Sequence, residues 1–294
     1  MAARRRYALA QASALALLLV AVACRATPSG EPVPTATPKA QPIADSPTTS
    51  AEPPPAVPPP PKLAAIESAN GFVELEVPGF RKATVSVPVD TSAPRRIVVA
   101  LHGNFDRPEW QCEVWRRIIA AEDFVLCPRG IPRQDVPKEY DRWEWGSLAK
   151  TKAELVAALA ALRERYPQHI EPGPIIFTGF SLGAILGARL ILDAELNVGA
   201  AVFTEGGFES WTSAKAKSAA SSLSFFLLGC GQTACRNAYR YQLEPLFKKA
   251  GLNAVMVADV KGGHTYDDPV AALVAAEWPK LLASLRREPG EKPK

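Results

Sequence analysis

Six nearly continuous apolar segments most constrain what this chain of 294 residues can fold into. In chain order they are residues 96–103, 124–130, 174–179, 199–204, 223–229 and 253–260. Runs of this kind are typical of strands that are buried on both faces of a parallel sheet. Two earlier segments, residues 72–77 and 83–89, alternate apolar and polar side chains. That alternation indicates half-buried antiparallel strands at the start of the same sheet.

Helical patterns lie between these segments. Residues 148–166 carry one apolar stripe at steps of three and four residues, formed by Leu155, Leu159, Leu162 and Tyr166, and Pro167 follows directly. Residues 182–192 are apolar nearly all round, which predicts a buried helix, and residues 239–251 and 270–287 also have helical patterns. Alternating strands and helices predict an α/β fold, a mostly parallel, doubly wound sheet of about eight strands with helices on both faces.

The first 24 residues read as an export signal rather than as part of a folded domain. Three arginines at positions 4–6 precede an apolar stretch, residues 9–22, that is too short to span a bilayer comfortably, and small residues lead to Cys24. The segment resembles a bacterial lipoprotein signal. That resemblance implies cleavage before Cys24, lipidation of its thiol, and anchoring in the outer membrane. Ala21 stands where leucine is usual, so ordinary cleavage to a periplasmic or extracellular protein, an uncleaved anchor and twin-arginine export stay open.

The composition divides the rest of the chain into three parts. Residues 25–62 hold 13 of the 28 prolines and predict an extended, disordered tether. Residues 63–287 form one predicted domain with a single core, and residues 288–294 a flexible tail. Without the signal the chain has 31 basic and 30 acidic residues, so its charge gives no indication of nucleic-acid binding. We expect a monomer whose membrane contact depends on modification of Cys24.

Four cysteines remain after Cys24, an even number in a chain that is expected to leave the reducing cytoplasm. Proximity in the predicted fold favours pairing Cys112 with Cys127 and Cys230 with Cys235 among the three possible connectivities. The alternative is four buried free thiols.

The sequence Gly179-Phe180-Ser181-Leu182-Gly183 stands between a predicted strand and a predicted buried helix. G-x-S-x-G in that setting is typical of a sharp turn that raises a serine hydroxyl above the carboxyl edge of a sheet. Over residues 70–287 the chain resembles the α/β-hydrolase family, whose nucleophile position matches Ser181. The alternative is a serine that merely caps the following helix.

A serine hydroxyl needs a base within hydrogen-bond reach, and the chain has three histidines. His169 lies in a polar turn after Pro167, and His102 precedes Ser181, against the order of the family. His264 follows the last predicted strand in the sequence KGGHTYDDP and is the candidate base, with a histidine of a surface loop as the alternative. We expect His102 to brace its loop rather than to transfer protons.

The resemblance implies an oxyanion hole made from backbone N–H groups. His102 and Gly103 correspond to the family's H-G segment, which points to the N–H of Asn104 as one donor and that of Leu182 as the other. These roles need backbone atoms only. No cofactor or metal is expected for this chemistry.

The sequence leaves open which residue would be the acid of a catalytic triad. The family usually carries an aspartate soon after the strand at residues 223–229, but this chain has no carboxylate between Cys230 and Cys235. Glu205, at the end of the preceding strand, is the first candidate to orient His264. A pocket-lining or surface role for Glu205 stays open, with Gln232, Asp267 and Asp268 as the other residues able to bond His264.

Aromatic residues are predicted to line the substrate pocket. They are Phe105, Trp143, Trp145, Phe180 and Tyr266, and core packing is the alternative for each of them. Fewer than twenty residues separate the strands at 199–204 and 223–229, which leaves no room for a large cap domain. The sequence therefore predicts an exported serine hydrolase, foremost a carboxylic ester hydrolase acting on a small or polymeric ester. A serine peptidase and a non-catalytic binding protein on the same fold are the alternatives.

Overall fold

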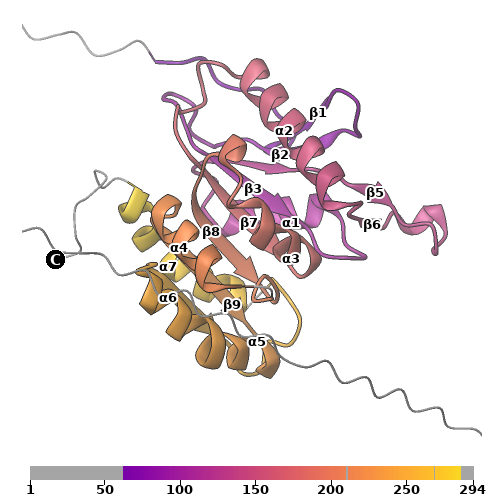
Figure 1. Ribbon diagram of the computed structural model, residues 1–294. Coiled ribbons are helices and arrows are strands. Elements are labelled where there is room, and N and C mark those ends of the chain that lie inside the picture. The colour runs from indigo at the N-terminus through magenta and orange to yellow at the C-terminus, as the bar shows by residue number, and fades with distance from the viewer. Residues whose placement is uncertain (1–61, 210, 268, 286–294) are drawn as a thin grey trace, which may run out of the picture. The chain divides into compact units, whose positions relative to one another are not determined.

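An eight-stranded sheet organises the computed structural model, which describes residues 62–209, 211–267 and 269–285 (Figure 1). The strands lie in the spatial order β1 (Phe72–Leu75), β2 (Ala83–Ser86), β4 (Phe124–Cys127), β3 (Ile97–Leu101), β7 (Ile175–Phe180), β8 (Val198–Thr204), β9 (Phe225–Cys230) and β10 (Ala254–Ala258). Strand β2 pairs antiparallel with β1 and β4, and every pair from β4 to β10 is parallel. The predicted sheet, including its two antiparallel opening strands, is confirmed.

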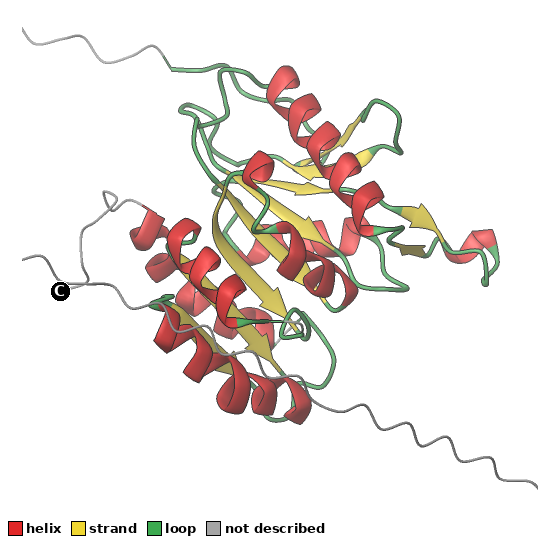
Figure 2. Ribbon diagram, viewed as in Figure 1, coloured by secondary structure: helices red, strands yellow, loops and turns green. Residues whose placement is uncertain are grey.

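Helices cover both faces of this sheet (Figure 2). Helices α1 (Pro108–Ile118) and α7 (Val270–Leu285) pack on one face, and α2 (Leu148–Arg165), α3 (Leu182–Leu190), α4 (Ser213–Ser222) and α6 (Glu244–Ala250) pack on the other. Side chains of a strand point alternately to the two faces. In β3, Val98 and Ala100 therefore join the core under α1 and α7, whereas Val99 and Leu101 join the other core.

The ends of α2 follow from its sequence. The side chain of Ser147 caps the helix by accepting from the N–H of Lys150 at 3.4 Å, and Leu155, Leu159 and Leu162 are buried against the sheet. The helix ends at Arg165, one residue before the predicted end and two before Pro167. Helix α3 covers most of the predicted residues 182–192, and a short 3₁₀ helix, η2 (Ala194–Leu196), follows it.

Three helices were not predicted: α1, α4 and α5 (Thr233–Ala238). The segment predicted as one helix, residues 239–251, is a π-helical turn, η3 (Tyr239–Leu243), that continues into α6. The prediction of Gly251 as the terminating residue is confirmed, because Gly251 adopts a left-handed conformation with φ of 79°. A π-helical turn has no simple periodicity in sequence, and it widens the helix where Tyr241 and Gln242 project.

A two-stranded ribbon extends from the sheet after β4. It consists of β5 (Ile131–Pro132), the 3₁₀ helix η1 (Lys138–Tyr140) and β6 (Trp143–Glu144), and we call residues 131–144 the β5–β6 arm. The arm projects away from the sheet in Figure 1. Its base is tied to the loop after β3, because the N–H of Phe105 donates to the carbonyl of Trp143 at 3.1 Å and the N–H of Trp143 to that of Asp106 at 3.1 Å.

Both predicted disulfides are present. Cys112 and Cys127 join α1 to β4, and Cys230 and Cys235 join β9 to α5. In the part of the chain that the structure describes, no helix combines the length and apolar character that crossing a membrane requires. The predicted signal with Cys24, nearly all of the predicted tether, the tail at 288–294 and Asp268 lie outside the described residues.

Candidate active site

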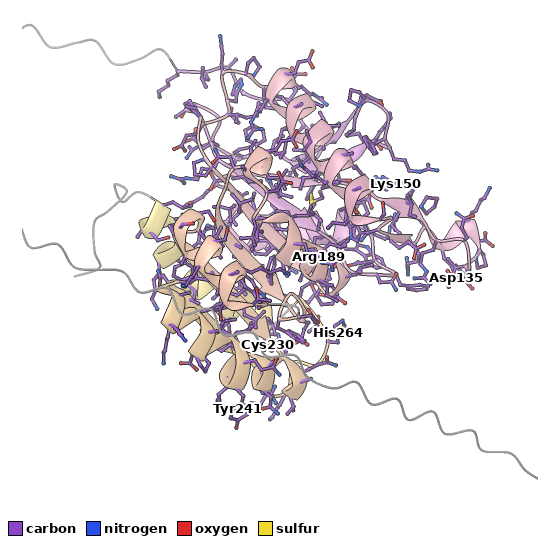
Figure 3. All side chains as sticks on the ribbon, in the orientation of Figure 1. Asp135, Lys150, Arg189, Cys230, Tyr241 and His264 are labelled. Atoms are coloured by element: carbon purple, nitrogen blue, oxygen red, sulfur yellow. A yellow bond between two sulfur atoms is a disulfide. The ribbon has the colours of Figure 1, made fainter. Side chains whose placement is uncertain are left out.

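Parallel strands bring their carboxyl ends to the same edge of a sheet, and the candidate residues stand in the loops at that edge. His102 follows β3, Ser181 follows β7, Glu205 follows β8, Gln232 follows β9 and His264 follows β10. Five separate segments of the sequence therefore contribute to one small region. The labels in Figure 3 place His264 there, and Asp135 at the far end of the β5–β6 arm.

Ser181 occupies a strained turn between β7 and α3. Its φ of 48° and ψ of −114° lie in a region that residues other than glycine rarely adopt, at a cost of about 1–3 kcal/mol. The turn is held by the Ser181 N–H, which donates to the carbonyl of Thr204 at 3.0 Å. A Cβ at position 179 would lie 2.7 Å from the carbonyl carbon of Gly183, so Gly179 is required sterically.

The hydroxyl of Ser181 meets the imidazole of His264. The distance from Ser181 Oγ to His264 Nε2 is 2.9 Å, which is a hydrogen bond between two loops that are 83 residues apart in sequence. The His264 side chain is 43 % exposed, and its ring lies beside that of Phe180 at a centroid separation of 5.0 Å. A serine hydroxyl in contact with an accessible imidazole is the arrangement that general-base activation requires.

Glu205 lies on the other side of the imidazole. Its Oε2 is 3.6 Å from His264 Nδ1, and the side chain is only 1 % exposed. Its Oε1 accepts from the N–H groups of Gly231 and Gln232, the latter at 2.9 Å, whereas Oε2 is buried without a hydrogen-bond partner. The carboxylate is thus fixed by one oxygen and directs the unpartnered oxygen towards the histidine.

The other candidates for the acid do not place a carboxylate at His264 Nδ1. The side-chain oxygen of Gln232 is 3.3 Å from His264 Nδ1, closer than the carboxylate, but it carries no charge that would stabilise an imidazolium. Asp267 instead forms an ion pair with Arg117 at 3.6 Å. Among the described residues, Glu205 is the carboxylate placed at Nδ1.

The two residues predicted to donate backbone N–H groups to an oxyanion are Leu182 and Asn104. Leu182 is the first residue of α3, so its N–H has no acceptor within the helix. The loop after β3 runs beside Ser181, because a Cβ built on Gly103 would lie 3.4 Å from the Ser181 Cβ. Asn104 follows in that loop, and its side-chain oxygen accepts from the guanidinium of Arg133. The side chain of Asn104 is therefore engaged outside the turn, and its backbone is what the site can use.

His102 is completely buried, in contrast to His264. Its Nδ1 lies 2.8 Å from the carbonyl of Gly103 and its Nε2 2.9 Å from the carbonyl of Arg129. Trp145 stacks on the imidazole at 4.5 Å and donates its indole N–H to the His102 carbonyl at 2.8 Å. Burial lowers the pKa of His102, and these contacts fix the loop after β3.

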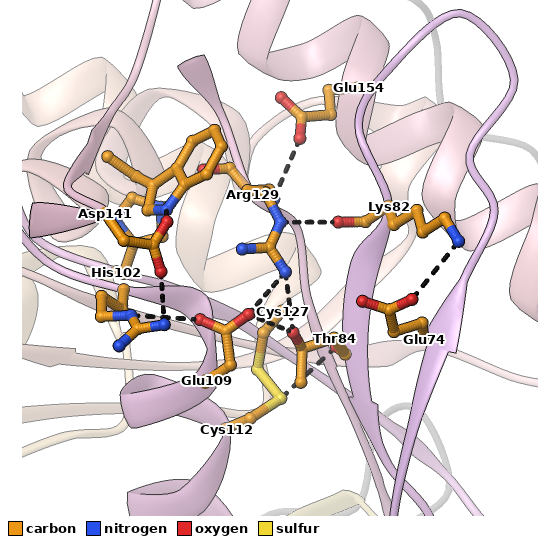
Figure 4. A network of polar contacts seen from close by, with 12 residues as sticks. Glu74, Lys82, Thr84, His102, Glu109, Cys112, Cys127, Arg129, Asp141 and Glu154 are labelled. Carbon is orange, nitrogen blue, oxygen red and sulfur yellow. Dashed lines mark hydrogen bonds and ion pairs between the residues drawn. A yellow bond between two sulfur atoms is a disulfide. The ribbon is translucent and has the colours of Figure 1, made fainter. Parts of the chain in front are cut away.

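The Arg129 carbonyl that His102 contacts belongs to a segment that Glu154 holds in place (Figure 4). The buried Glu154, from α2, accepts from the N–H of Arg129 at 3.0 Å and from that of Gly130 at 2.8 Å. The Arg129 side chain pairs with Glu109 at 2.5 Å. Burial raises the pKa of Glu154, although the two N–H groups act in the opposite direction.

A contact that was not predicted joins the loops after β3 and β10. The hydroxyl of Tyr266 donates to Asp106 Oδ1 at 3.1 Å, and Asp106 Oδ2 accepts from the N–H of Gly103 at 3.3 Å. The loop that carries His264 is thereby tied to the loop beside the candidate oxyanion donors. No signal in the sequence could have found this pair, because its members are 160 residues apart and form no motif.

The predicted aromatic lining is divided between surface and interior. Phe105 is 46 % exposed, Phe180 is buried, and Tyr266 is half-buried with its ring 4.6 Å from that of Phe180. Trp143 and Trp145 are both buried: Trp145 packs on His102, and the guanidinium groups of Arg81 and Arg129 lie 5.2 and 5.0 Å from the ring of Trp143. The two tryptophans support the loops, and Phe105 presents the open ring.

Comparison with known proteins identifies the architecture. No protein-family model and no curated protein matches the chain. Among solved structures, TT1662 from Thermus thermophilus is 14 % identical over 74 % of this chain and 98 % of its own length, with a TM-score of 0.50. The carboxylesterase of Bacillus cereus is 19 % identical over 69 % of this chain and 96 % of its own, with a TM-score of 0.50.

A third structure, esterase PE8, is 17 % identical over 71 % of this chain and 100 % of its own length, again with a TM-score of 0.50. Likeness at this level of identity establishes the fold. The chain has the α/β-hydrolase fold, with a mostly parallel sheet of eight strands and, among the described residues, no large cap domain.

Proposed function

We propose that this chain is a serine hydrolase that cleaves carboxylic esters through an acyl-enzyme on Ser181. The observation that carries the proposal is the 2.9 Å hydrogen bond from Ser181 Oγ to His264 Nε2, at a strained turn of an α/β-hydrolase fold. The structural likeness to a carboxylesterase and to an esterase supports the ester chemistry by analogy.

The proposed reaction gives a role to the serine, the histidine, the glutamate and the two backbone N–H groups of the site. His264 Nε2 takes the proton of Ser181 as Oγ attacks the ester carbonyl, and the N–H groups of Leu182 and Asn104 stabilise the oxyanion. The protonated His264 then gives its proton to the departing alkoxide, which leaves the acyl group on Ser181. Water, activated by the same imidazole, releases the acid. The Glu205 carboxylate stabilises the imidazolium through Nδ1.

Covalent labelling tests this proposal. A fluorophosphonate should label the wild-type protein at one site, the labelled peptide should contain Ser181, and Ser181→Ala should abolish the label. Ser221→Ala is the matched control, because Ser221 is an exposed serine on α4. A folded wild-type protein that resists labelling would favour a non-catalytic binding protein.

The choice between ester and amide needs a second measurement. Esters of graded acyl length, aryl esters and peptide amides should be compared by kcat/KM on one preparation. We expect turnover of esters and little of amides. Amide cleavage at a comparable rate would reassign the chain as a serine peptidase.

We also propose export with lipidation of Cys24, on the sequence resemblance alone. Mass spectrometry of the mature N-terminus should show a diacylglyceryl cysteine at position 24. Cys24→Ala should prevent the modification and release the protein from the membrane fraction. An unmodified N-terminus beyond residue 24 would indicate ordinary cleavage.

A further inference from the structure

The β5–β6 arm holds a basic pocket beside the candidate active site. The pocket has a volume of about 380 Å³, and its charged lining residues in the described part of the chain are Arg81, Arg133, Lys138, Arg142 and Asp141. Trp143 also lines it. A concave surface lined by four cations and one carboxylate attracts anions.

The single carboxylate of the lining is already engaged. Asp141 forms an ion pair with Arg107, and Arg133 is paired with Asp135 at 2.5 Å and with Glu144 at 3.5 Å. Arg81, Lys138 and Arg142 have no ion pair within the described residues. These three side chains are the uncompensated positive charge of the pocket.

Aromatic rings, not carboxylates, hold the free arginines. The guanidinium of Arg142 lies 5.3 Å from the ring of Phe105 and 4.6 Å from that of Trp110, and both rings are at least 40 % exposed. The guanidinium of Arg81 lies 5.2 Å from the ring of Trp143. Arg142 also donates through Nη1 to the carbonyl of Tyr140 at 2.7 Å. Stacking and this hydrogen bond order the guanidinium, and its other N–H groups can bind a planar anion. An arginine held in this way binds a carboxylate or phosphate at a smaller entropic cost than a mobile one.

The pocket is joined to the candidate oxyanion loop by direct contacts. Arg133 donates to the side-chain oxygen of Asn104, and its guanidinium also lies 5.5 Å from the ring of Phe105. Phe105 is thus flanked by Arg133 and Arg142, and it follows the residue whose N–H is a candidate oxyanion donor. The pocket therefore contacts the same loop whose Gly103 lies beside Ser181.

We propose that Arg142, with Arg81 and Lys138, binds an anionic group on the same molecule as the scissile ester. The inference rests on the proposed function and deepens it. The substrate class becomes esters that bear a carboxylate or another planar or tetrahedral anion, with the anion in the arm pocket and the carbonyl at Ser181. A bidentate contact from a guanidinium to such a group gives selectivity that a lysine or a neutral donor does not match.

Two matched pairs of esters test this selectivity. The acyl-side pair is 4-nitrophenyl butyrate and 4-nitrophenyl hemisuccinate, and the alcohol-side pair is phenyl butyrate and 4-carboxyphenyl butyrate. For each pair the ratio of kcat/KM, anionic over neutral, is measured for wild type, Arg142→Gln and Arg142→Lys. Comparing ratios between variants cancels the intrinsic reactivity of the esters.

We expect Arg142→Gln to lower this ratio about tenfold for at least one pair, and Arg142→Lys to restore part of it. The wild-type ratio should also fall as ionic strength rises. Arg240→Gln, an exposed arginine on η3, is the control and should keep the wild-type ratio. A ratio unchanged by Arg142→Gln in both pairs overturns the inference.

Fluorophosphonate labelling separates the two proposals. A protein that labels at Ser181 and hydrolyses both members of each pair without an effect of Arg142 keeps the proposed function and loses only the anion site. A protein that neither labels nor turns over any ester overturns both. Circular dichroism of Arg142→Gln shows whether a lowered ratio comes from a folded protein.

Discussion

The loops after β3 and β10 each carry a histidine to the same edge of the sheet, and they use it in opposite ways. The loop at residues 102–106 buries His102 completely between Trp145 and two carbonyl groups. The loop at residues 262–267 leaves His264 43 % exposed, with Ser181 on one nitrogen and Glu205 near the other.

The difference shows how position in the structure decides what an imidazole does. Both nitrogens of His102 lie against backbone carbonyls, so a substrate has no access to either. His264 has a hydroxyl on Nε2, amide and carboxylate oxygens near Nδ1, and a side chain that is open to solvent. His102 supports its loop, and we propose that His264 is the base.

The largest effect expected from this contrast is on turnover in His264→Gln. Loss of the base should lower kcat about 10⁴-fold or more, and the free energy of unfolding should stay within about 0.5 kcal/mol of wild type because the side chain is exposed. Ester hydrolysis and urea unfolding on the same sample measure both. His169→Gln removes a half-buried histidine from the turn after α2 and should leave kcat unchanged. Substantial activity in His264→Gln would remove the distinction between the two loops.

The next effect concerns the acid. Glu205→Gln should lower kcat by about 10²- to 10⁴-fold, because the amide oxygen can still accept from the N–H groups of Gly231 and Gln232 but cannot stabilise an imidazolium. Gln232→Leu should cost less than about tenfold. If Gln232→Leu proves the more damaging of the two, the neutral amide orients His264 and Glu205 has a structural role.

His102→Phe should show the opposite balance to His264→Gln. A phenyl ring can still stack on Trp145, but it removes the one N–H that a neutral imidazole donates to the carbonyl of Gly103 or of Arg129, which should lower the free energy of unfolding by about 1–3 kcal/mol. The loss of kcat should be much smaller than in His264→Gln. Chemical denaturation followed by circular dichroism measures the first effect, and a stability equal to wild type would contradict the bracing role.

The smallest expected effect is on the pH dependence of the free energy of unfolding, and it involves Glu154, which holds the segment beside His102. Burial raises the pKa of Glu154 in the folded protein, so the contribution of this group to stability is fully present below its ordinary pKa of about 4.5 and is lost as pH rises through the folded value. Glu154→Gln can keep the contacts to Arg129 and Gly130 without the cost of a buried charge.

The free energy of unfolding of Glu154→Gln, relative to that of wild type, should therefore be higher at pH 8 than at pH 4.5, by about 1 kcal/mol or less. Urea unfolding at both pH values measures the difference. A gain at the lower pH instead would mean that the ionised carboxylate stabilises the segment.

Much of the fold follows from local patterns in the sequence. Every strand of the main sheet coincides with an apolar or alternating segment. Burial on both faces requires a continuous apolar run, and burial on one face requires alternation. The turn at Ser181 was equally visible, since its glycines are required locally. Helices α1, α4 and α5 were not predicted, and residues 239–243 were predicted as ordinary helix. Helix α4 is mostly polar, α5 has only six residues, and a π-helical turn has no period of its own.

The remaining parts of the site depend on which strands are neighbours. Glu205 reaches His264 because β8 lies beside both β7 and β9, so the loop after β9 supplies the two N–H groups that fix its carboxylate. The contact of Tyr266 with Asp106, and of Arg133 with Asn104, likewise joins loops that only the assembled sheet brings together. Such contacts join residues that are far apart in the chain and form no motif, so the sequence alone does not predict them.

The position of β10 bears on how the candidate site assembles after denaturation. β10 is one of the two edge strands of the sheet, among the described residues it pairs only with β9, and the residues that follow it deliver His264. The serine turn needs only the central strands, whereas its partner imidazole arrives with the outermost one. We therefore expect ester turnover, as proposed above, to return in a refolding chain only when this strand has docked, after the signals that report the helices or the interior of the sheet.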